Sequence, residues 1–435
     1  MSSLTFKRSK KYFLLILFFF WMFTPSLNLG VTNLNTNIFF IVLPSFLGAF
    51  LYFRKGMGSK LINMTFISMI LSFIIVLAYT SFGLINNIVD YYIPKTVLMG
   101  FFILFSAYFI VKIHKDIYEE NFVAILLRNL FYIGVIHSII ILLTALSSVF
   151  SDTLYQIVNL TDKQQKYISS DVIIKRYSGL LETGFSSLSV THGLLLVSGI
   201  IFYWKYDNNF SLSRTCWFLT LFSLIFLSLI MTGRSGLIIF LFFAISLIVY
   251  LFLELFIKMI INKKMFNLFL LLSFLSIAIL IFFDFSDYKN QIDTSFEIFI
   301  SFINTGEFRS ASTDQLLENE LLFPSGMELM FGSGNFGLGS SRIASDIGFV
   351  YLVNGMGILG TFIVFIPYLL PIYFANQNRK YSLFLFLYML FVVLILIPLN
   401  FKDLYFLGFA GHTKIFFILI CTYHFIILER KKYQK

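Results

Sequence analysis

Long apolar runs follow one another along almost the whole chain and are separated by short polar segments. A lipid bilayer requires about 20 consecutive apolar residues for each helical crossing. The pattern therefore predicts an all-α polytopic membrane protein with about 12 transmembrane helices. The expected spans cover residues 12–28, 37–53, 61–84, 93–111, 122–149, 186–204, 215–231, 236–257, 266–283, 345–374, 381–399 and 411–428.

The composition agrees with this prediction, and the distribution of charge gives an orientation. Apolar residues make up 58% of the 435 residues, charged residues only 12%, and the mean hydropathy is +0.87. When the N-terminus is placed inside, most Lys and Arg residues fall in the inner loops, whereas most acidic residues fall outside. Because basic loops remain cytoplasmic, both termini are predicted to be cytoplasmic. This bias accounts for the net charge of +10, so we expect no nucleic-acid partner.

Two external segments are too long to be simple turns between spans. The first covers residues 151–185, and the second, residues 284–343, is the only soluble-looking stretch. Loops of this length in a compact protein are usually functional. The chain is therefore divided into residues 1–283, with nine spans and the loop at 151–185, the large external loop at 284–343, and residues 344–435, with three spans and a cytoplasmic tail.

The large external loop contains an amphipathic pattern and a glycine-rich stretch. Phe296, Phe299, Ile300 and Ile303 recur at helical spacing, which indicates either a helix on the membrane surface or a helix packed on the protein. Residues 331–339 (FGSGNFGLG) have two open roles: their backbone amides approach a phosphate, or they form a flexible return into the membrane. No strand is expected before them, so a dinucleotide or Walker fingerprint is excluded.

Three arginines converge on the outer face in this topology. Arg234 lies in residues 232–236 (TGRSG), between two long apolar runs, and Arg176 and Arg342 lie in the external loops. A guanidinium presents a planar fork that matches phosphate oxygens, so the three arginines are candidates to hold a pyrophosphate. The alternative is contact with lipid head groups or loop carboxylates. We weigh it equally for Arg342 and as weaker for Arg234, whose tight turn leaves little freedom.

A general base near these arginines requires a carboxylate or a histidine. Asp346 is the first candidate, although the cap of a helix explains it equally well, and Glu182 follows at a distance. His192 is expected to be a buried, hydrogen-bonded histidine. His412 and Lys414 either add to the anion site or mark the membrane boundary. With no paired Asp-x-Asp on the outer face, we expect a metal-independent site without a cofactor.

With these features, the chain resembles the Wzy-type polysaccharide polymerases and, more distantly, the O-antigen ligases of the same superfamily. The resemblance covers the topology of nearly the whole chain, with one dominant external loop late in the sequence. Locally it rests on the strings RYSGL, TGRSG, FGSG, SDIGF and GMGILG at residues 176–180, 232–236, 331–334, 345–349 and 355–360.

The resemblance implies a GT-C-type glycosyltransferase in the bacterial cytoplasmic (inner) membrane that assembles O-antigen or capsule. It would transfer a growing glycan from undecaprenyl pyrophosphate to the non-reducing end of a new lipid-linked repeat unit. Arg176 and Arg234 would bind the pyrophosphate, and the large loop would shape the acceptor site. A chain-length regulator and a flippase are the protein partners that such an enzyme implies, beside the lipid bilayer itself.

Two other functions remain open at this stage. An O-antigen ligase would carry a histidine in the large loop, and residues 284–343 contain none, so Asp346 would have to take that place. A lipid-linked oligosaccharide flippase or another transporter would favour broken helices and charges near the middle of the bilayer. The candidate charges of this chain are instead expected at the outer boundary.

Overall fold

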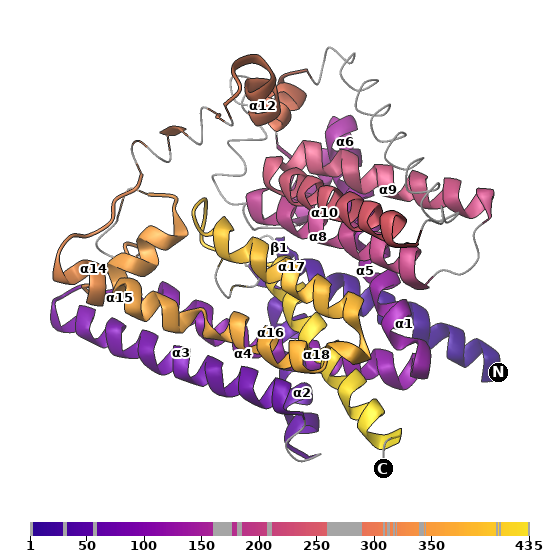
Figure 1. Ribbon diagram of the computed structural model, residues 1–435, viewed down its shortest axis with the longest axis horizontal. Coiled ribbons are helices and arrows are strands. Elements are labelled where there is room, and N and C mark those ends of the chain that lie inside the picture. Colours follow the sequence, from indigo (N-terminus) through magenta and orange to yellow (C-terminus); the bar gives the residue numbers. More distant parts are fainter. Residues whose placement is uncertain are drawn as a thin grey trace. The chain divides into compact units, whose positions relative to one another are not determined.

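The computed structural model in Figure 1 consists almost entirely of helices. Among the described residues, six helical segments are long and apolar enough to cross a membrane: Lys60–Ile85, Tyr92–Leu146, Phe185–Tyr206, Ser213–Thr232, Gly348–Gln377 and Gly411–Arg430. Shorter apolar helices cover Ile38–Arg54, Arg234–Val249 and Leu383–Leu399. The chain is therefore a helical, multi-pass membrane protein. The structure describes residues 3–28, 33–54, 59–159, 176–180, 185–206, 211–258, 289–307, 309–310, 314–315, 318, 320–338, 343, 345–405, 408 and 410–433.

The chain forms two compact units, and each is built from two separate parts of the sequence. Unit 1 comprises Met1–Phe40 and His114–Phe308, and unit 2 comprises Ile41–Ile113 and Arg309–Lys435.

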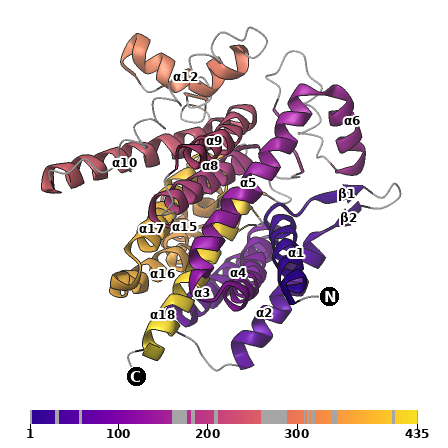
Figure 2. The same ribbon diagram turned by 90° about the vertical axis from the view of Figure 1, so that its right-hand side faces the viewer.

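Unit 1 is a bundle in which α8 packs against α5, α9 and α10 (Figure 1, Figure 2). Phenylalanine rings fill its core, and Phe131 and Phe218 stack with their centroids 5.2 Å apart. α9 begins after Ser211, whose hydroxyl accepts the N–H of Arg214 at 3.3 Å and so caps the helix. The helices of unit 1 are α1 (Ser3–Phe23), α5 (Phe122–Leu146), α6 (Ser148–Ile157), α8 (Phe185–Ile201), α9 (Leu212–Thr232), α10 (Arg234–Lys258) and α12 (Lys289–Thr305), with short turns η2 (Glu119–Asn121) and η3 (Phe202–Tyr206).

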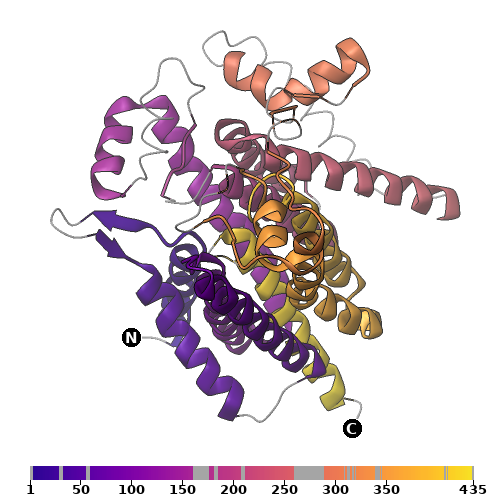
Figure 3. The same cartoon turned by 90° about the vertical axis from the view of Figure 1, so that its left-hand side faces the viewer.

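A small hairpin follows the first helix of unit 1. β1 (Ser26–Asn28) pairs antiparallel with β2 (Asn33–Asn35), and Figure 3 shows the two strands side by side. Leu27 also bridges to Val158, just after α6. The expected span at 12–28 is therefore shorter than predicted at its end, because α1 stops at Phe23 and the chain then becomes extended.

Unit 2 contains the remaining helices, with α15 and α16 packed along α3 (Figure 1). α2 and α4 approach so closely that a Cβ on Gly48 would collide with the carbonyl of Phe105. The elements of unit 2 are η1 (Ile38–Val42, across the unit boundary), α2 (Leu43–Arg54), α3 (Lys60–Ile85), α4 (Tyr92–Tyr118, whose last turn belongs to unit 1), α14 (Met327–Phe331), α15 (Gly348–Val364), α16 (Ile366–Gln377), η5 (Arg379–Tyr381), α17 (Leu383–Leu399) and α18 (Gly411–Tyr433).

The long apolar run at 345–374 is broken into two helices. α15 ends at Val364 and α16 begins at Ile366, and Gly357 inside α15 has φ 65° and ψ −178°. A positive φ is available to glycine because it has no Cβ. The expected span at 122–149 likewise ends at Leu146, where α6 follows after Ser147. The expected span at 266–283 lies outside the described residues.

The amphipathic pattern of the large loop forms α12. Phe296 is buried in the core of unit 1 and Ile300 packs against it, whereas Ile303 is exposed. The side chain of Phe299 lies outside the described set. α12 is thus a helix packed on the protein through part of its apolar face.

Candidate anion-binding site

A single residue joins two long apolar helices at the turn formed by residues 232–236, which we call the Arg234 turn. α9 ends at Thr232, α10 begins at Arg234, and Gly233 between them has φ 153°. Thr232 donates its hydroxyl hydrogen to the carbonyl of Ser228 at 2.9 Å. Because both flanking residues are held in helices, the backbone fixes where the Arg234 side chain begins. Arg234 is only 8% exposed.

α8 holds the Arg234 turn in place through small and polar residues. The Ser189 hydroxyl donates to the carbonyl of Gly233 and accepts the N–H of Gly236 at 2.9 Å. The hydroxyls of Ser186 and Ser235 lie 3.1 Å apart. A Cβ on Gly236 would collide with the Ser189 carbonyl, so close approach of α8 and α10 requires glycine there.

The segment that carries Arg176 lies against the end of α9. The backbone N–H of Tyr177 donates to the carbonyl of Met231 at 3.3 Å, and Tyr177 and Ser178 are buried. Met231 is three residues before Arg234, so the two arginine-bearing segments are neighbours. Arg176 itself is half-buried and engaged in an interaction of its own.

A carboxylate from the large loop binds the Arg234 guanidinium. Glu297 on α12 forms a charge-assisted hydrogen bond through Oε2 with Nη1 of Arg234, and the Glu297 side chain is one-third exposed. The N-terminus of α10 adds the positive end of a helix dipole at the same place. This corrects the sequence analysis, which treated a loop carboxylate as the weaker alternative for Arg234. The turn therefore holds an oxyanion, supplied here by the chain itself.

Asp346 lies in unit 2, where its predicted capping role is not observed. The residue before α15 is Ile347, which makes no side-chain cap hydrogen bond, and its own N–H donates to the hydroxyl of Ser345 at 3.0 Å. The Glu320 carboxylate accepts the backbone N–H of Asp346 at 2.6 Å, and Ser345 donates its hydroxyl hydrogen to the carbonyl of Glu320. Asp346 itself is exposed.

The other predicted site residues are either buried or not described. His412 and Lys414 open α18 and are 2% and 0% exposed, so they do not lie at an exposed boundary. The ring of His412 is 5.1 Å from the ring of Tyr405. Glu182 and Arg342 lie outside the described residues.

The backbone amides of the glycine-rich stretch are used within the fold. We call residues 331–338 the glycine return. Ser333 and Gly334 donate their N–H groups to the carbonyls of Asn354 and Gly355 on α15, at 2.8 and 2.9 Å. The amides of Asn335 and Gly337 bind side chains within the return. Leu338 donates its N–H to the Asp90 carboxylate at 2.8 Å. Because these N–H groups already have partners within the fold, they are not presented to a phosphate. The glycine return is a structural joint.

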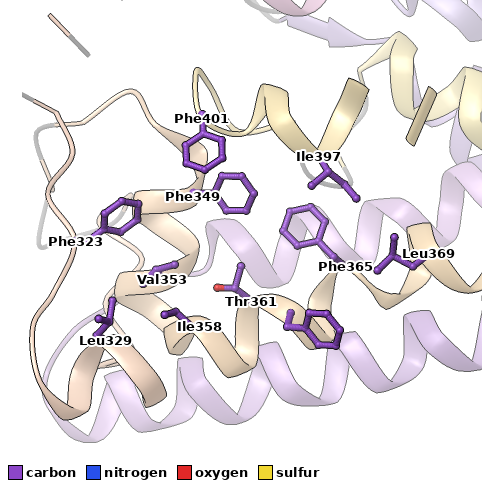
Figure 4. Close-up of a pocket in the computed structure, with 11 residues that line it drawn as sticks. Phe323, Leu329, Phe349, Val353, Ile358, Thr361, Phe365, Leu369, Ile397 and Phe401 are labelled. Carbon is purple, nitrogen blue, oxygen red and sulfur yellow. The ribbon is translucent and has the colours of Figure 1, made fainter. Parts of the chain in front are cut away.

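Unit 2 also contains an apolar cavity of about 490 Å³ beside this joint (Figure 4). Thr361 is the polar residue among those that line it, and its hydroxyl donates to the carbonyl of Gly357 at 2.7 Å. The cavity thus offers no polar group for a sugar or a phosphate. Its lining consists of Phe323, Leu329, Phe349, Val353, Ile358, Thr361, Phe362, Phe365, Leu369, Ile397 and Phe401.

Sequence reasoning missed the residues that hold Arg234. Ser189 and Gly193 are four residues apart on α8, and a Cβ on Gly193 would be 2.8 Å from the carbonyl of Gly236. This small-residue spacing is typical of close helix packing in membranes and was a usable signal. Glu297 follows Phe296 in the amphipathic pattern, yet no local signal pairs it with an arginine 63 residues away.

Comparison of the chain with family models, curated proteins and solved structures gave no match. Its function is therefore inferred from its own residues and contacts.

Proposed function

We propose that the chain is a membrane glycosyltransferase that polymerises lipid-linked oligosaccharide repeat units, as Wzy-type polymerases do. One observation carries the proposal: the largely buried guanidinium of Arg234, at the N-terminus of α10 and beside the Arg176 segment, already holds an oxyanion. A pyrophosphate presents the same kind of oxygen with more charge. In this proposal the chain crosses the inner membrane about 12 times with GT-C-type architecture, and both termini are cytoplasmic.

The proposed reaction exchanges one bond at the anomeric carbon of the donor glycan. A hydroxyl of the incoming repeat unit attacks this carbon, the bond between the carbon and the pyrophosphate oxygen breaks, and undecaprenyl pyrophosphate leaves with the electron pair. The hydroxyl proton passes to a carboxylate general base, for which Asp346, an exposed residue, remains the prediction from the sequence. Negative charge develops on the leaving group, and arginines stabilise it there.

Arg234 and Glu297 have distinct parts in this scheme. The Arg234 guanidinium binds a phosphate oxygen of the donor, and the donor displaces the Glu297 carboxylate from it. Because Glu297 is one-third exposed on α12, this carboxylate can turn to water when the phosphate arrives. The Ser186 and Ser235 hydroxyls are bonded to each other at the same turn, and the one that accepts this bond supplies a further donor to a phosphate oxygen.

The decisive test is Arg234→Ala in a host that lacks its own polymerase. We expect polymer to be lost and single repeat units to remain on the acceptor, with unchanged abundance of the protein in the membrane. Arg214→Ala is the matched control, because Arg214 is an exposed arginine at the other end of α9. Full-length polymer from Arg234→Ala would overturn the proposed site. Restoration of surface polymer by the unmodified chain in a host that lacks only its ligase would instead indicate a ligase.

One observation favours transport as a second candidate. The helix break at Gly357 lies inside an apolar span, and broken helices are typical of transporters. The carbonyls next to the break are bound by Ser333 and Gly334, however, and so are not presented to a substrate. Purified protein that extends lipid-linked repeats in detergent, where no second compartment exists, would exclude transport as its sole activity.

A further inference from the structure

Two buried histidines form a hydrogen-bonded chain across three helices of unit 1. His137 on α5 and His192 on α8 are both fully buried, and Nδ1 of His137 lies 2.9 Å from Nε2 of His192. Nδ1 of His192 lies 2.7 Å from the hydroxyl of Ser228 on α9. As expected from the sequence, His192 is a buried, hydrogen-bonded histidine, but its partners extend well beyond its own helix.

The direction of every bond in this chain follows from one backbone donor. The N–H of Leu180 donates to Nε2 of His137 at 3.2 Å, so Nε2 is an acceptor and the proton of neutral His137 is on Nδ1. That proton is donated to Nε2 of His192, which places the proton of His192 on Nδ1, directed at Ser228. Ser228 in turn donates to the carbonyl of Ile225 at 2.7 Å.

The two ends of this chain lie at the two arginine-bearing segments. Leu180 closes residues 176–180, and the preceding Gly179, with φ 57°, leaves so little room that a Cβ would be 2.9 Å from Nε2 of His137. At the other end, the carbonyl of Ser228 accepts the Thr232 hydroxyl at the start of the Arg234 turn. The hydrogen bonds thus link the segment that carries Arg176 to α9, the helix that ends at the Arg234 turn.

The surroundings allow these side chains few other positions. The ring of Phe23 stacks on His137 with centroids 3.9 Å apart and an interplanar angle of 9°. The hydroxyl of Ser138 lies 2.9 Å from that of Ser228 and, because Ser228 already donates to Ile225, Ser138 is the donor in this bond. A buried network in which every member is satisfied stabilises one arrangement of its parts.

We propose that His137, His192 and Ser228 are positioning residues that set the Arg176 segment against the Arg234 turn. The inference rests on the proposed function, since it assigns these residues to the site that binds the donor pyrophosphate. They contact no substrate and act through the two arginines.

The first test compares two serines of the same helix. Ser228→Ala removes the acceptor of His192, whereas Ser223→Ala removes only a hydroxyl bonded to the carbonyl of Leu219 within α9. We expect Ser228→Ala to raise the KM for a lipid-linked donor about tenfold, the effect of one misplaced charged hydrogen bond, with little change in kcat. Ser223→Ala should leave both constants unchanged.

Substitutions of His137 provide a rescue. His137→Phe keeps the ring but removes the acceptor for Leu180, and His137→Gln restores an acceptor near the position of Nε2. We expect the donor KM to rise in His137→Phe and to return most of the way in His137→Gln. An equal defect in the two variants would contradict the positioning role.

A labelling experiment tests the position without activity. In a Cys216→Ser background, which removes the exposed native thiol, Arg176→Cys reports the access of maleimide to its segment. We expect labelling to accelerate severalfold when Ser228→Ala or His137→Phe is added. Unchanged labelling, together with an unchanged donor KM of Ser228→Ala and His137→Phe in the chain that keeps Arg176, would overturn the inference. Polymer from Arg234→Ala would instead overturn the proposed function. The labelling, which needs no activity, would still show whether His137 and Ser228 position the Arg176 segment.

Discussion

Two glycine-containing joints lie beside long apolar helices, and they differ in what they bind. In unit 1 the Arg234 turn opens α10 and holds a carboxylate through a guanidinium. In unit 2 the glycine return donates its amides to α15 and to Asp90. In the sequence, the turn offered a guanidinium to a phosphate, and the return offered backbone N–H groups. The guanidinium holds an oxyanion, whereas the N–H groups of the return are bonded within the fold.

In both joints glycine serves to bring backbone against backbone. Gly236 meets the carbonyl of Ser189 in unit 1, and Gly334 meets Gly83 in unit 2. The capacity to bind an anion comes from Arg234 and the start of a helix, not from the glycines. Substitutions can affect close backbone packing and leave anion binding unchanged, or the reverse.

The largest effect is expected from Gly334→Ala in the glycine return. A Cβ there would be 2.5 Å from the backbone nitrogen of Gly83, and the residue has φ 79°. Overpacking and the left-handed backbone together destabilise by about 2–5 kcal/mol. We expect a sharp fall in membrane abundance and in the apparent Tm in detergent.

Gly326→Ala is the matched control for that prediction. Gly326 has φ 61° in the same loop, but nothing lies within 4 Å of a Cβ. It should show only the smaller backbone effect of about 1–2 kcal/mol. Equal losses from the two variants would mean that the close approach to Gly83 does not hold the joint together.

Arg234→Lys separates charge from shape at the Arg234 turn. Lysine keeps the positive charge but loses the planar fork that matches phosphate oxygens. The loss of charge-assisted hydrogen bonds of about 1.5–3 kcal/mol corresponds to a roughly 10- to 100-fold lower rate of polymer formation. The measurement is polymer formed per molecule of membrane protein. Full activity of this variant would show that a point charge suffices.

Ser189→Ala and Ser333→Ala compare the hydroxyls that secure the two joints. Ser189 binds Gly233 and Gly236, and Ser333 binds Asn354 and Asn335. Each loses two hydrogen bonds, so a destabilisation of about 1–3 kcal/mol is expected for both. Only Ser189→Ala should also lower polymer formation per molecule, by a few fold. Lower polymer formation per molecule from Ser333→Ala alone would place the function at the glycine return.

Glu297→Gln should have the smallest effect on stability. The carboxylate is one-third exposed, so loss of the ion pair costs about 1 kcal/mol or less. Because an internal competitor has been removed, inorganic pyrophosphate should raise the apparent Tm of this variant more than that of the unmodified protein. Glu307→Gln, an exposed position near the end of α12, is the control. A complete loss of polymer would contradict the role of Glu297 as a displaceable partner.

Helical spans were predictable because apolar length alone requires them. The run at 61–84 corresponds to Lys60–Ile85, and that at 411–428 lies within Gly411–Tyr433. The break at Gly357 was not predictable, since glycine within an apolar run fits a continuous helix equally well. A Cβ on Gly357 would collide with the backbone of Met330 and Phe331, and no local pattern encodes this close approach.

At the site, the importance of Arg234 followed from its position in a tight turn, but its partners did not. Ser189 and Glu297 are brought to the turn by the packing of α8 and α12. The Arg176 segment is held beside the turn by the backbone bond between Tyr177 and Met231 and by the bond from Leu180 to His137. Such tertiary contacts depend on helix pairing, which the sequence of one chain leaves undetermined.

The interleaved construction of the two units has a consequence for biosynthesis. Chains are made from the N-terminus, so α3 enters the membrane well before α15 and α16, against which it packs. The second part of unit 1, His114–Phe308, is synthesised during this interval. A nascent chain that stops at residue 308 contains every residue of the Arg234 turn and its partners, yet its α3 has none of its final neighbours among α15–α18. Completion of unit 2 is therefore the last step of assembly, and an early stop codon after residue 308 would leave α3 exposed to membrane quality control.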